Sequence, residues 1–234
     1  MHLFKRLPTR RMELLAVYVL VLVIAALLNW LHDKDANLTR TITLLALELL
    51  LPLMAGLAAC GLLAGDPLLE IMLSAHRPIR QILAERLAFP ALSGALLGML
   101  LLRLTQGWGV ELISNPSHQL FIWLPPLVFC LGLGSVAALW RGQVTDGVIA
   151  VIVLMGAGLI SIPLLQSACQ TVPSGQMCWW WLASPLMTCS VGTNTAWPLN
   201  RLFWLLLGLG LLALSFSMAQ REETLSQAKD AALQ

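Results

Sequence analysis

The sequence predicts an all-α membrane protein that crosses the bilayer six times, with both termini in the cytoplasm. Of its 234 residues, 58% are hydrophobic and only 11% are charged, whereas an ordinary soluble domain carries roughly a quarter charged residues. Too few charged side chains remain to cover a water-facing surface, so we expect the chain to meet lipid. The net charge of +2 gives no indication of nucleic-acid binding.

Six apolar segments have the length of about 20 residues that a helix needs to cross the hydrocarbon core. Leu, Ala and Met dominate them and favour helix, and the alternation that a membrane barrel requires is missing. The predicted spans are Met12–Leu31, Thr41–Ala64, Leu87–Thr105, Gln119–Leu139, Gly147–Ser167 and Leu202–Ala219. A basic, amphipathic segment (1–11) precedes this transmembrane domain (12–219). A polar tail (220–234) follows it, and we expect the tail to continue the last helix.

The orientation follows from the basic residues, because Lys and Arg collect on the cytoplasmic side of membrane proteins. Ten of them fall on one predicted side, namely Lys5, Arg6, Arg10, Arg11, Arg77, Arg80, Arg86, Arg141, Arg221 and Lys229. The other side holds Lys34, Arg40, Arg103 and Arg201. This distribution predicts a multi-pass protein of the cell (inner or plasma) membrane with both ends inside.

Tryptophans and glycines have expected roles within this topology. Most tryptophans lie at or near predicted span ends, and we interpret them as interface anchors that keep the indole N–H hydrated. Glycine pairs within the spans are expected to let helices approach closely. These pairs are Gly132-Leu133-Gly134, Gly156-Ala157-Gly158 and Gly208-Leu209-Gly210.

The predicted cytoplasmic connector, residues 65–86, has the pattern of two short amphipathic helices hinged near His76-Arg77-Pro78. Asp66 followed by Pro67 is a favourable helix start, and an apolar face follows from Leu68 to Leu73. A second short helix is expected from Pro78 to Arg86. Two interpretations remain open: a pair of interfacial helices that anchors the loop, or a docking surface for a cytoplasmic partner.

The connector resembles the first cytoplasmic loop of ABC-2 type transporter permeases. The residues that carry the resemblance are Asp66, Glu70-Ile71-Met72-Leu73-Ser74, Pro78-Ile79, Arg80, Ile82-Leu83 and Arg86. Loops of that family often contain an acidic residue, then Glu-Leu-Leu-Leu-Ser, a short gap, Pro-Val or Pro-Ile, and a basic residue. His76-Arg77 departs from the pattern, because a small residue often precedes the proline. The predicted topology also matches the plan of the family.

The resemblance implies a type V-like ABC-2 permease architecture and the role of transmembrane subunit in an ATP-driven exporter. Such permeases pair as homodimers or heterodimers, and two separate ATPase subunits dock beneath them. Implied ATPase-coupling residues are Asp66, Leu68, Leu69, Glu70, Met72, Leu73, Ser74, Arg77, Pro78, Arg80 and Arg86. ATP and magnesium would be bound by the ATPase, and this chain would bind no cofactor. Membrane lipid is a further expected partner.

No motif predicts that the chain is itself an enzyme. The phosphate-cradling string GxxxxGK[ST] does not occur in the sequence, so ATP hydrolysis would require another polypeptide. The HExxH string of metalloproteases is also missing. All four histidines fall outside the predicted spans, where none is in reach of an intramembrane serine.

Glu48 is the clear acidic residue inside a predicted span and is therefore a candidate for the transport pathway. Two roles remain open. It either pairs with Arg40, Arg103 or Arg201, or it binds a coupling proton or a cationic substrate. The second role would make the protein a small secondary carrier, which is the alternative function. A membrane scaffold subunit that transports nothing is a further alternative.

The predicted outer connection, residues 169–201, is too long for a tight turn. Its apolar runs are too short to span the membrane, so we expect interfacial or re-entrant pieces. Three cysteines lie in it, on a side that faces an oxidising compartment. We therefore hypothesise a Cys169–Cys178 disulfide, with Cys189 as an equally acceptable partner for either thiol.

Overall fold

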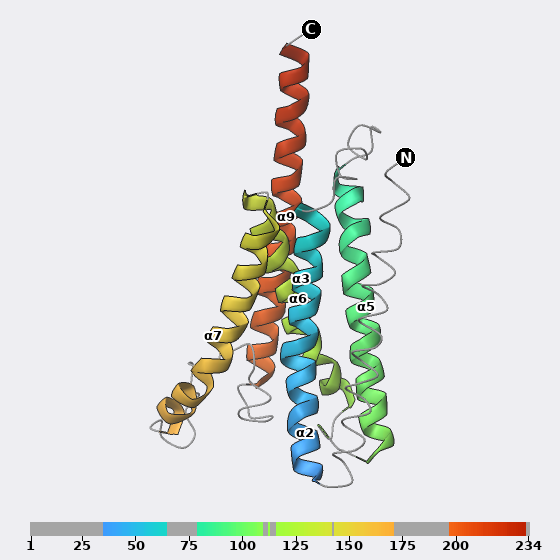
Figure 1. Ribbon diagram of the computed structural model, residues 1–234, viewed down its shortest axis with the longest axis vertical. Helices are drawn as coiled ribbons and strands as arrows, with labels where there is room; N and C mark the ends of the chain where they lie inside the picture. Colours follow the sequence, from blue (N-terminus) through green and yellow to red (C-terminus); the bar gives the residue numbers. More distant parts are fainter. Residues whose placement is uncertain are drawn as a thin grey trace.

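A computed structural model describes residues 35–64, 79–109, 112, 116–141, 143–170 and 197–232 (Figure 1). Its elements are α2 (Ala36–Leu45), the π-helix η2 (Ala46–Leu50), α3 (Leu51–Ala64), α5 (Ile79–Gly107), α6 (Pro116–Arg141), α7 (Val144–Gln170) and α9 (Trp197–Ala232). These ranges contain no strand. The prediction of an all-α fold is therefore confirmed for this part of the chain.

Four helical segments of the described chain are long and apolar enough to cross a membrane. They are Leu38–Leu63, Ile79–Gly107, His118–Trp140 and Trp197–Arg221, and they cover the second, third, fourth and sixth predicted spans. The fifth predicted span lies on α7, where a shorter apolar helix, Val144–Ile160, is found. The first, Met12–Leu31, lies outside the described residues. The structure thus agrees with a membrane protein, and the count of six spans stays a prediction.

The helices run back and forth between two ends of the bundle (Figure 1). The α2, η2 and α3 segments follow one another directly and end at Ala64. We call this end, where α3 ends and α5 begins, the loop end, and the opposite one the α2 end. Helix α9 starts at the α2 end and extends beyond the loop end toward the C-terminus (Figure 1).

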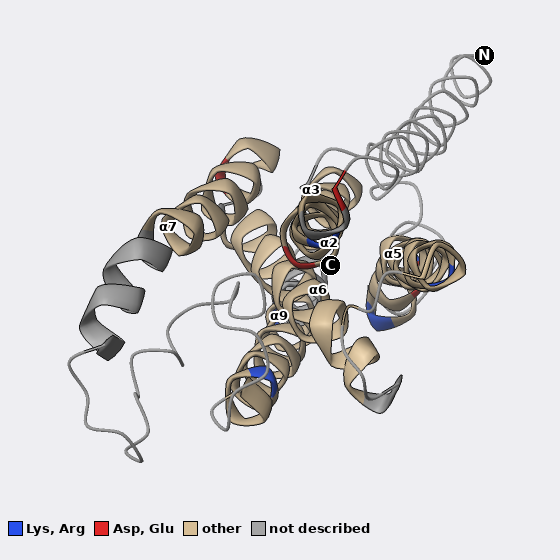
Figure 2. Ribbon diagram, turned by 90° about the horizontal axis from the view of Figure 1, so that it is seen from below, with Lys and Arg blue, Asp and Glu red and all other residues tan. Residues whose placement is uncertain are grey.

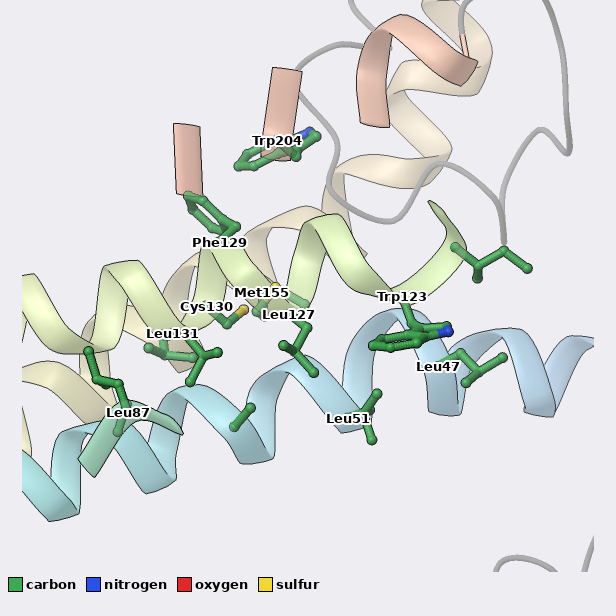
Figure 3. Packing of buried hydrophobic residues seen from close by; sticks show 14 of the residues in the cluster. Leu47, Leu51, Leu87, Trp123, Leu127, Phe129, Cys130, Leu131, Met155 and Trp204 are labelled. Carbon is green, nitrogen blue, oxygen red and sulfur yellow. The ribbon is translucent and has the colours of Figure 1, made fainter. Parts of the chain in front are cut away.

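Helix α6 is the centre of the bundle. It packs extensively against α3 and α9 and also touches α5 and α7, and the view along the helices shows it between these elements (Figure 2). Its side chains Ile122, Leu127 and Cys130 are almost fully buried. Figure 3 shows how the buried residues of α6 meet Leu47 and Leu51 on one side and Trp204 on the other.

Glycines bring the backbone of α6 close to both neighbours. A Cβ atom added to Gly208 of α9 would lie 2.6 Å from the backbone nitrogen of Phe129. One added to Gly134 would lie 2.6 Å from the carbonyl oxygen of Gly56 on α3. Small residues allow such close approach between membrane helices. The expected close packing is confirmed at Gly132, Gly134 and Gly208, whereas Gly156 and Gly210 face open space.

Helix α5 differs from the prediction at its start. The short helix expected from Pro78 to Arg86 is not separate, because α5 runs unbroken from Ile79 to Gly107. Ile82, Leu83 and Leu87 are all buried, so the apolar face assigned to the membrane interface packs inside the bundle. Because this face packs against neighbouring helices, the helix continues into the span without a break.

Helix α9 extends past its predicted span in both directions. It begins at Trp197, before the expected start at Leu202, and it continues to Ala232. The tail after Ala219 therefore continues the last helix, as predicted.

The α6–α9 contact predicts opposite effects for two neighbouring glycines. Gly208→Ala should lower the free energy of unfolding by about 1–3 kcal/mol, because the new methyl group meets backbone atoms that have no rotamer to change. Gly210→Ala is the matched control, because no atom lies within 4 Å of its Cβ position, and alanine favours helix over glycine. Thermal unfolding in detergent micelles measures both. Equal losses of stability in the two variants would contradict the observed packing.

Candidate functional site

A buried ion pair joins η2 to α9 in the half of the bundle nearer the α2 end. The Arg201 guanidinium donates a hydrogen bond from Nη2 to Oε1 of Glu48, and both side chains are 0% exposed. Two charges taken out of water are costly unless they compensate each other. Of the three arginines that the sequence left open as partners of Glu48, Arg201 is the one found here.

The other two arginines have different surroundings. Arg40 donates from Nη2 to the carbonyl oxygen of Leu112 at 3.2 Å, and Arg103 is exposed on α5. Neither is therefore buried with Glu48.

Arg201 lies on the face of α9 that packs against α6. Trp197, Arg201, Trp204 and Gly208 recur at intervals of four, three and four residues, which places them on one face of the helix. The Arg201 guanidinium carbon lies 5.7 Å from the centroid of the Trp197 ring, within the range of a cation–π contact. The same ring lies 5.4 Å from that of His118 on α6. The cation is thus held by aromatic contacts as well as by Glu48.

Glu48 lies in the π-helical turn η2, and the sequence supplies a reason for that turn. Pro52 has no N–H, and in a regular α-helix its ring would clash with the carbonyl group four residues earlier, that of Glu48. In the structure the N–H of Leu51 instead reaches back to the carbonyl oxygen of Ala46, five residues earlier. The wider turn relieves the clash. Single π-helical turns are rare and are frequent at functional sites.

The ion pair links two elements that otherwise have little contact. Helices α3 and α9 both pack along α6, but neither η2 nor α3 packs extensively against α9. Glu48 and Arg201 form a direct connection between η2 and α9. Figure 2 shows α9 and the α2–η2–α3 segment on different sides of α6.

Three tryptophans of α6 and α9 are buried inside the bundle. Trp123, Trp197 and Trp204 are 2%, 1% and 6% exposed, so the interpretation of Trp123 and Trp204 as interface anchors was wrong. For Trp204 the early start of α9 is the reason, because it moves this residue from the end of the helix into the contact with α6. The indole N–H groups of Trp123 and Trp204 have no hydrogen-bond partner within the described residues. Trp140, at the loop end, is 74% exposed.

A second feature ties together the two helices that flank the predicted coupling loop. The Arg86 side chain of α5 donates from Nη1 to the carbonyl oxygen of Leu62, near the end of α3, at 2.5 Å. The end of α3 and the start of α5 therefore lie together at the same end of the bundle. Arg80, six residues before Arg86, is exposed.

Most of the predicted coupling residues lie outside the described part of the chain. These are Asp66, Leu68, Leu69, Glu70, Met72, Leu73, Ser74, Arg77 and Pro78. Cys178 and Cys189 lie outside it as well, and the side chain of Cys169 is not described. The disulfide hypothesis and the role of the apolar ridge thus stay predictions.

The described side chains offer no site for a metal ion. No group of three or more His, Cys, Asp or Glu side chains is arranged to hold one within the described ranges. Cys60 and Cys130 are buried free thiols, and Cys60 donates to the carbonyl oxygen of Gly134 at 3.5 Å. We interpret both as packing residues of the core.

Comparisons of the chain with protein-family models, with curated proteins and with solved structures found no match.

The ion pair predicts a strong dependence of stability on both partners. Arg201→Met should lower the free energy of unfolding by about 3–5 kcal/mol, because it leaves the Glu48 carboxylate buried without its cation. Adding Glu48→Met should recover most of that loss, since two apolar side chains of similar volume can replace a buried pair. Arg103→Met, at an exposed arginine, serves as the control. Unfolding in mixed micelles measures all four proteins, and a double variant no more stable than Arg201→Met would argue against the pair.

Proposed function

We propose that this chain is the membrane-spanning subunit of an ABC-2 type exporter, driven by separate ATPase subunits that dock on residues 65–86. The observation that carries the proposal is the Arg86–Leu62 hydrogen bond. It holds the end of α3 and the start of α5, which flank this loop in the sequence, together at one end of the bundle. A loop that docks on a partner needs flanking helix ends that keep a fixed position relative to each other.

The charges at the loop end support a cytoplasmic position for this loop. Arg80, Arg86 and Arg221 belong to the described helices at this end, and basic residues favour the cytoplasmic side. The polar continuation of α9 emerges at the same end (Figure 1). The loop and the C-terminal helix then share the compartment that contains ATP.

The continuous helix α5 supplies a route from the loop to the opposite end of the bundle. It extends over 29 residues as one helix, with Pro90 inside it, and we expect a displacement of its first turn to be transmitted along its length. In the proposed mechanism, the apolar ridge from Leu68 to Leu73 seats in a groove of the ATPase. The bond from Arg86 to Leu62 makes α3 follow the same movement. A second permease chain completes the pathway.

The paired state of Glu48 argues against the secondary carrier. A coupling proton or a cationic substrate would have to displace a fully buried guanidinium from the carboxylate. The carrier would be supported instead by proton-dependent uptake into liposomes that contain this chain alone, provided that Glu48→Gln abolishes the uptake. We expect no such uptake.

The exporter proposal predicts a stoichiometric ATPase partner. Gentle solubilisation and purification of the chain should recover a protein with a phosphate-binding GxxxxGK[ST] motif. Leu69→Asp and Met72→Asp should each reduce this recovery at least about tenfold, because a charge in an apolar groove costs well over 1.4 kcal/mol. Membrane insertion of the variants should be unchanged.

Gln81→Ala provides a control beside the loop. Its side chain is exposed on the first turn of α5 and bonds only locally, from Nε2 to Oε1 of Glu85 at 3.3 Å. This variant should recover the ATPase as well as the unaltered chain does. If no ATPase accompanies the unaltered chain, or if the aspartate variants retain it fully, the proposal fails.

A further inference from the structure

We infer that one face of α3 is the docking surface for the chain's own first predicted span, residues 12–31, which lie outside the described residues. Met54, Ala58 and Gly61 form this face, which we call the open face: they recur at intervals of four and three residues, and all three are exposed. The first span covers them as an antiparallel partner of the α2–η2–α3 segment. The inference goes beyond the exporter proposal and does not rest on it, because it concerns packing within one chain.

The open face is turned away from α6. A Cβ atom added to Gly134 of α6 would lie 2.6 Å from the carbonyl oxygen of Gly56 and 3.0 Å from the Cys60 sulfur, so these two residues of α3 face α6. Gly56 follows Met54 by two residues, which at about 100° per residue places it on the opposite side of the helix. The open face and the contact with α6 are therefore opposite sides of α3.

Small residues at the open face leave room for a neighbouring helix. Helix α5 exposes large apolar side chains such as Leu96, at 72%, whereas α3 exposes Ala58 and Gly61 toward its end. A Cβ atom added to Gly61 would have no atom within 4 Å, and small residues let membrane helices approach closely. Composition alone does not name the neighbour, because α9 also exposes Gly210 and Ala213. The connectivity of the chain does.

The first predicted span is joined to α2 by a short connection. Residues 32–35 separate its end at Leu31 from the start of α2 at Ala36. That start is fixed, because Oδ1 of Asp35 accepts a hydrogen bond from the N–H of Leu38 at 3.2 Å. Four residues reach at most about 14 Å, whereas the axes of packed helices lie about 8–10 Å apart. A connection of this length joins antiparallel neighbours, so the span returns along the α2–η2–α3 segment.

The other sides of that segment are occupied by described helices. Helix α6 packs along both η2 and α3, and α5 and α7 also contact α3. Figure 2 shows α5 and α7 on different sides of the α2–α3 segment. The open face, opposite α6, is the side that remains for a further helix of the same chain. It also falls within the second predicted span, Thr41–Ala64, so an apolar helix beside it lies at the matching depth.

This packing sets the place of the basic N-terminal segment. Because α3 ends at the loop end, an antiparallel partner begins there, and residues 1–11 emerge at that end of the bundle. Their basic side chains then join Arg80 and Arg221 of the described helices. Basic residues gathered at one end agree with a single cytoplasmic side.

Photo-crosslinking of the full chain in its native membrane tests the inference. Ala58→p-benzoylphenylalanine places a photo-reactive benzophenone on the open face, and mass mapping after irradiation should find it linked to residues 12–31 of the same chain. Met54→p-benzoylphenylalanine repeats the test where a large side chain is already present. Because the pair is antiparallel, links from position 54 should fall about four residues, one helical turn, C-terminal to links from position 58.

Ala213→p-benzoylphenylalanine is the matched control, at an exposed alanine of α9. It lies at a similar depth on another side of α6, because the neighbouring positions Gly132 and Gly134 of α6 approach Leu212 of α9 and Gly56 of α3. This variant should form no link to residues 12–31.

Four results would overturn the inference: links from positions 54 and 58 to phospholipid alone, links to a second copy of the chain or to another protein, the opposite order of the linked residues, or equal linking from position 213. The outcome is separate from that of the exporter proposal. The expected links without any recovered ATPase would refute the exporter alone, and a recovered ATPase without these links would refute only the packing of the first span on α3.

Discussion

The Glu48–Arg201 ion pair constrains the arrangement of the described helices more than any other single interaction. An isolated buried carboxylate or guanidinium costs several kcal/mol, so η2 and α9 must stay within reach of each other across α6. Both side chains are fully buried, so hydration does not offset the free-energy cost of burying their charges. The rotation of α9 about its own axis follows from this requirement, because Arg201 must face η2.

That rotation determines which other residues of α9 meet α6. With Arg201 directed inward, Trp197 and Trp204 are buried on the same side, and Gly208 faces the backbone at Phe129. The ion pair thus sets the facing side of α9, and the glycines set how closely the two helices approach. Helix α3 also approaches α6 closely at glycines, namely Gly56 and Gly134. The central position of α6 is a consequence of both contacts.

The sequence predicted the features that depend on composition and local spacing. The length of the apolar segments predicted where the second, third, fourth and sixth spans lie. The glycines of the α6–α9 contact were expected to pack closely. Glu48 was recognised as an unusual residue in a span, but its partner was left open among three arginines, because the choice depends on helix rotation. Hydropathy alone does not contain that information.

Other features were missed because they depend on tertiary contacts. Trp204 was assigned to the interface, since the start of α9 was placed at Leu202 rather than at Trp197. The spacing of Trp197, Arg201 and Trp204 on one helical face was the available indication of their burial. Pro52 was likewise an indication of the irregular turn at Glu48. The unbroken start of α5 was missed because amphipathic periodicity does not distinguish a membrane surface from a neighbouring helix.

The most direct test of this account exchanges the two charges of the pair. Glu48→Arg and Arg201→Glu each place two like charges together in the interior, and we expect either change alone to prevent accumulation of folded protein. The combined exchange restores opposite charges, so folded protein should reappear, as measured by monodisperse elution after extraction from membranes. If the exchanged protein folds no better than the single reversals, Glu48 and Arg201 are not partners, and the arrangement of α9 described here is wrong.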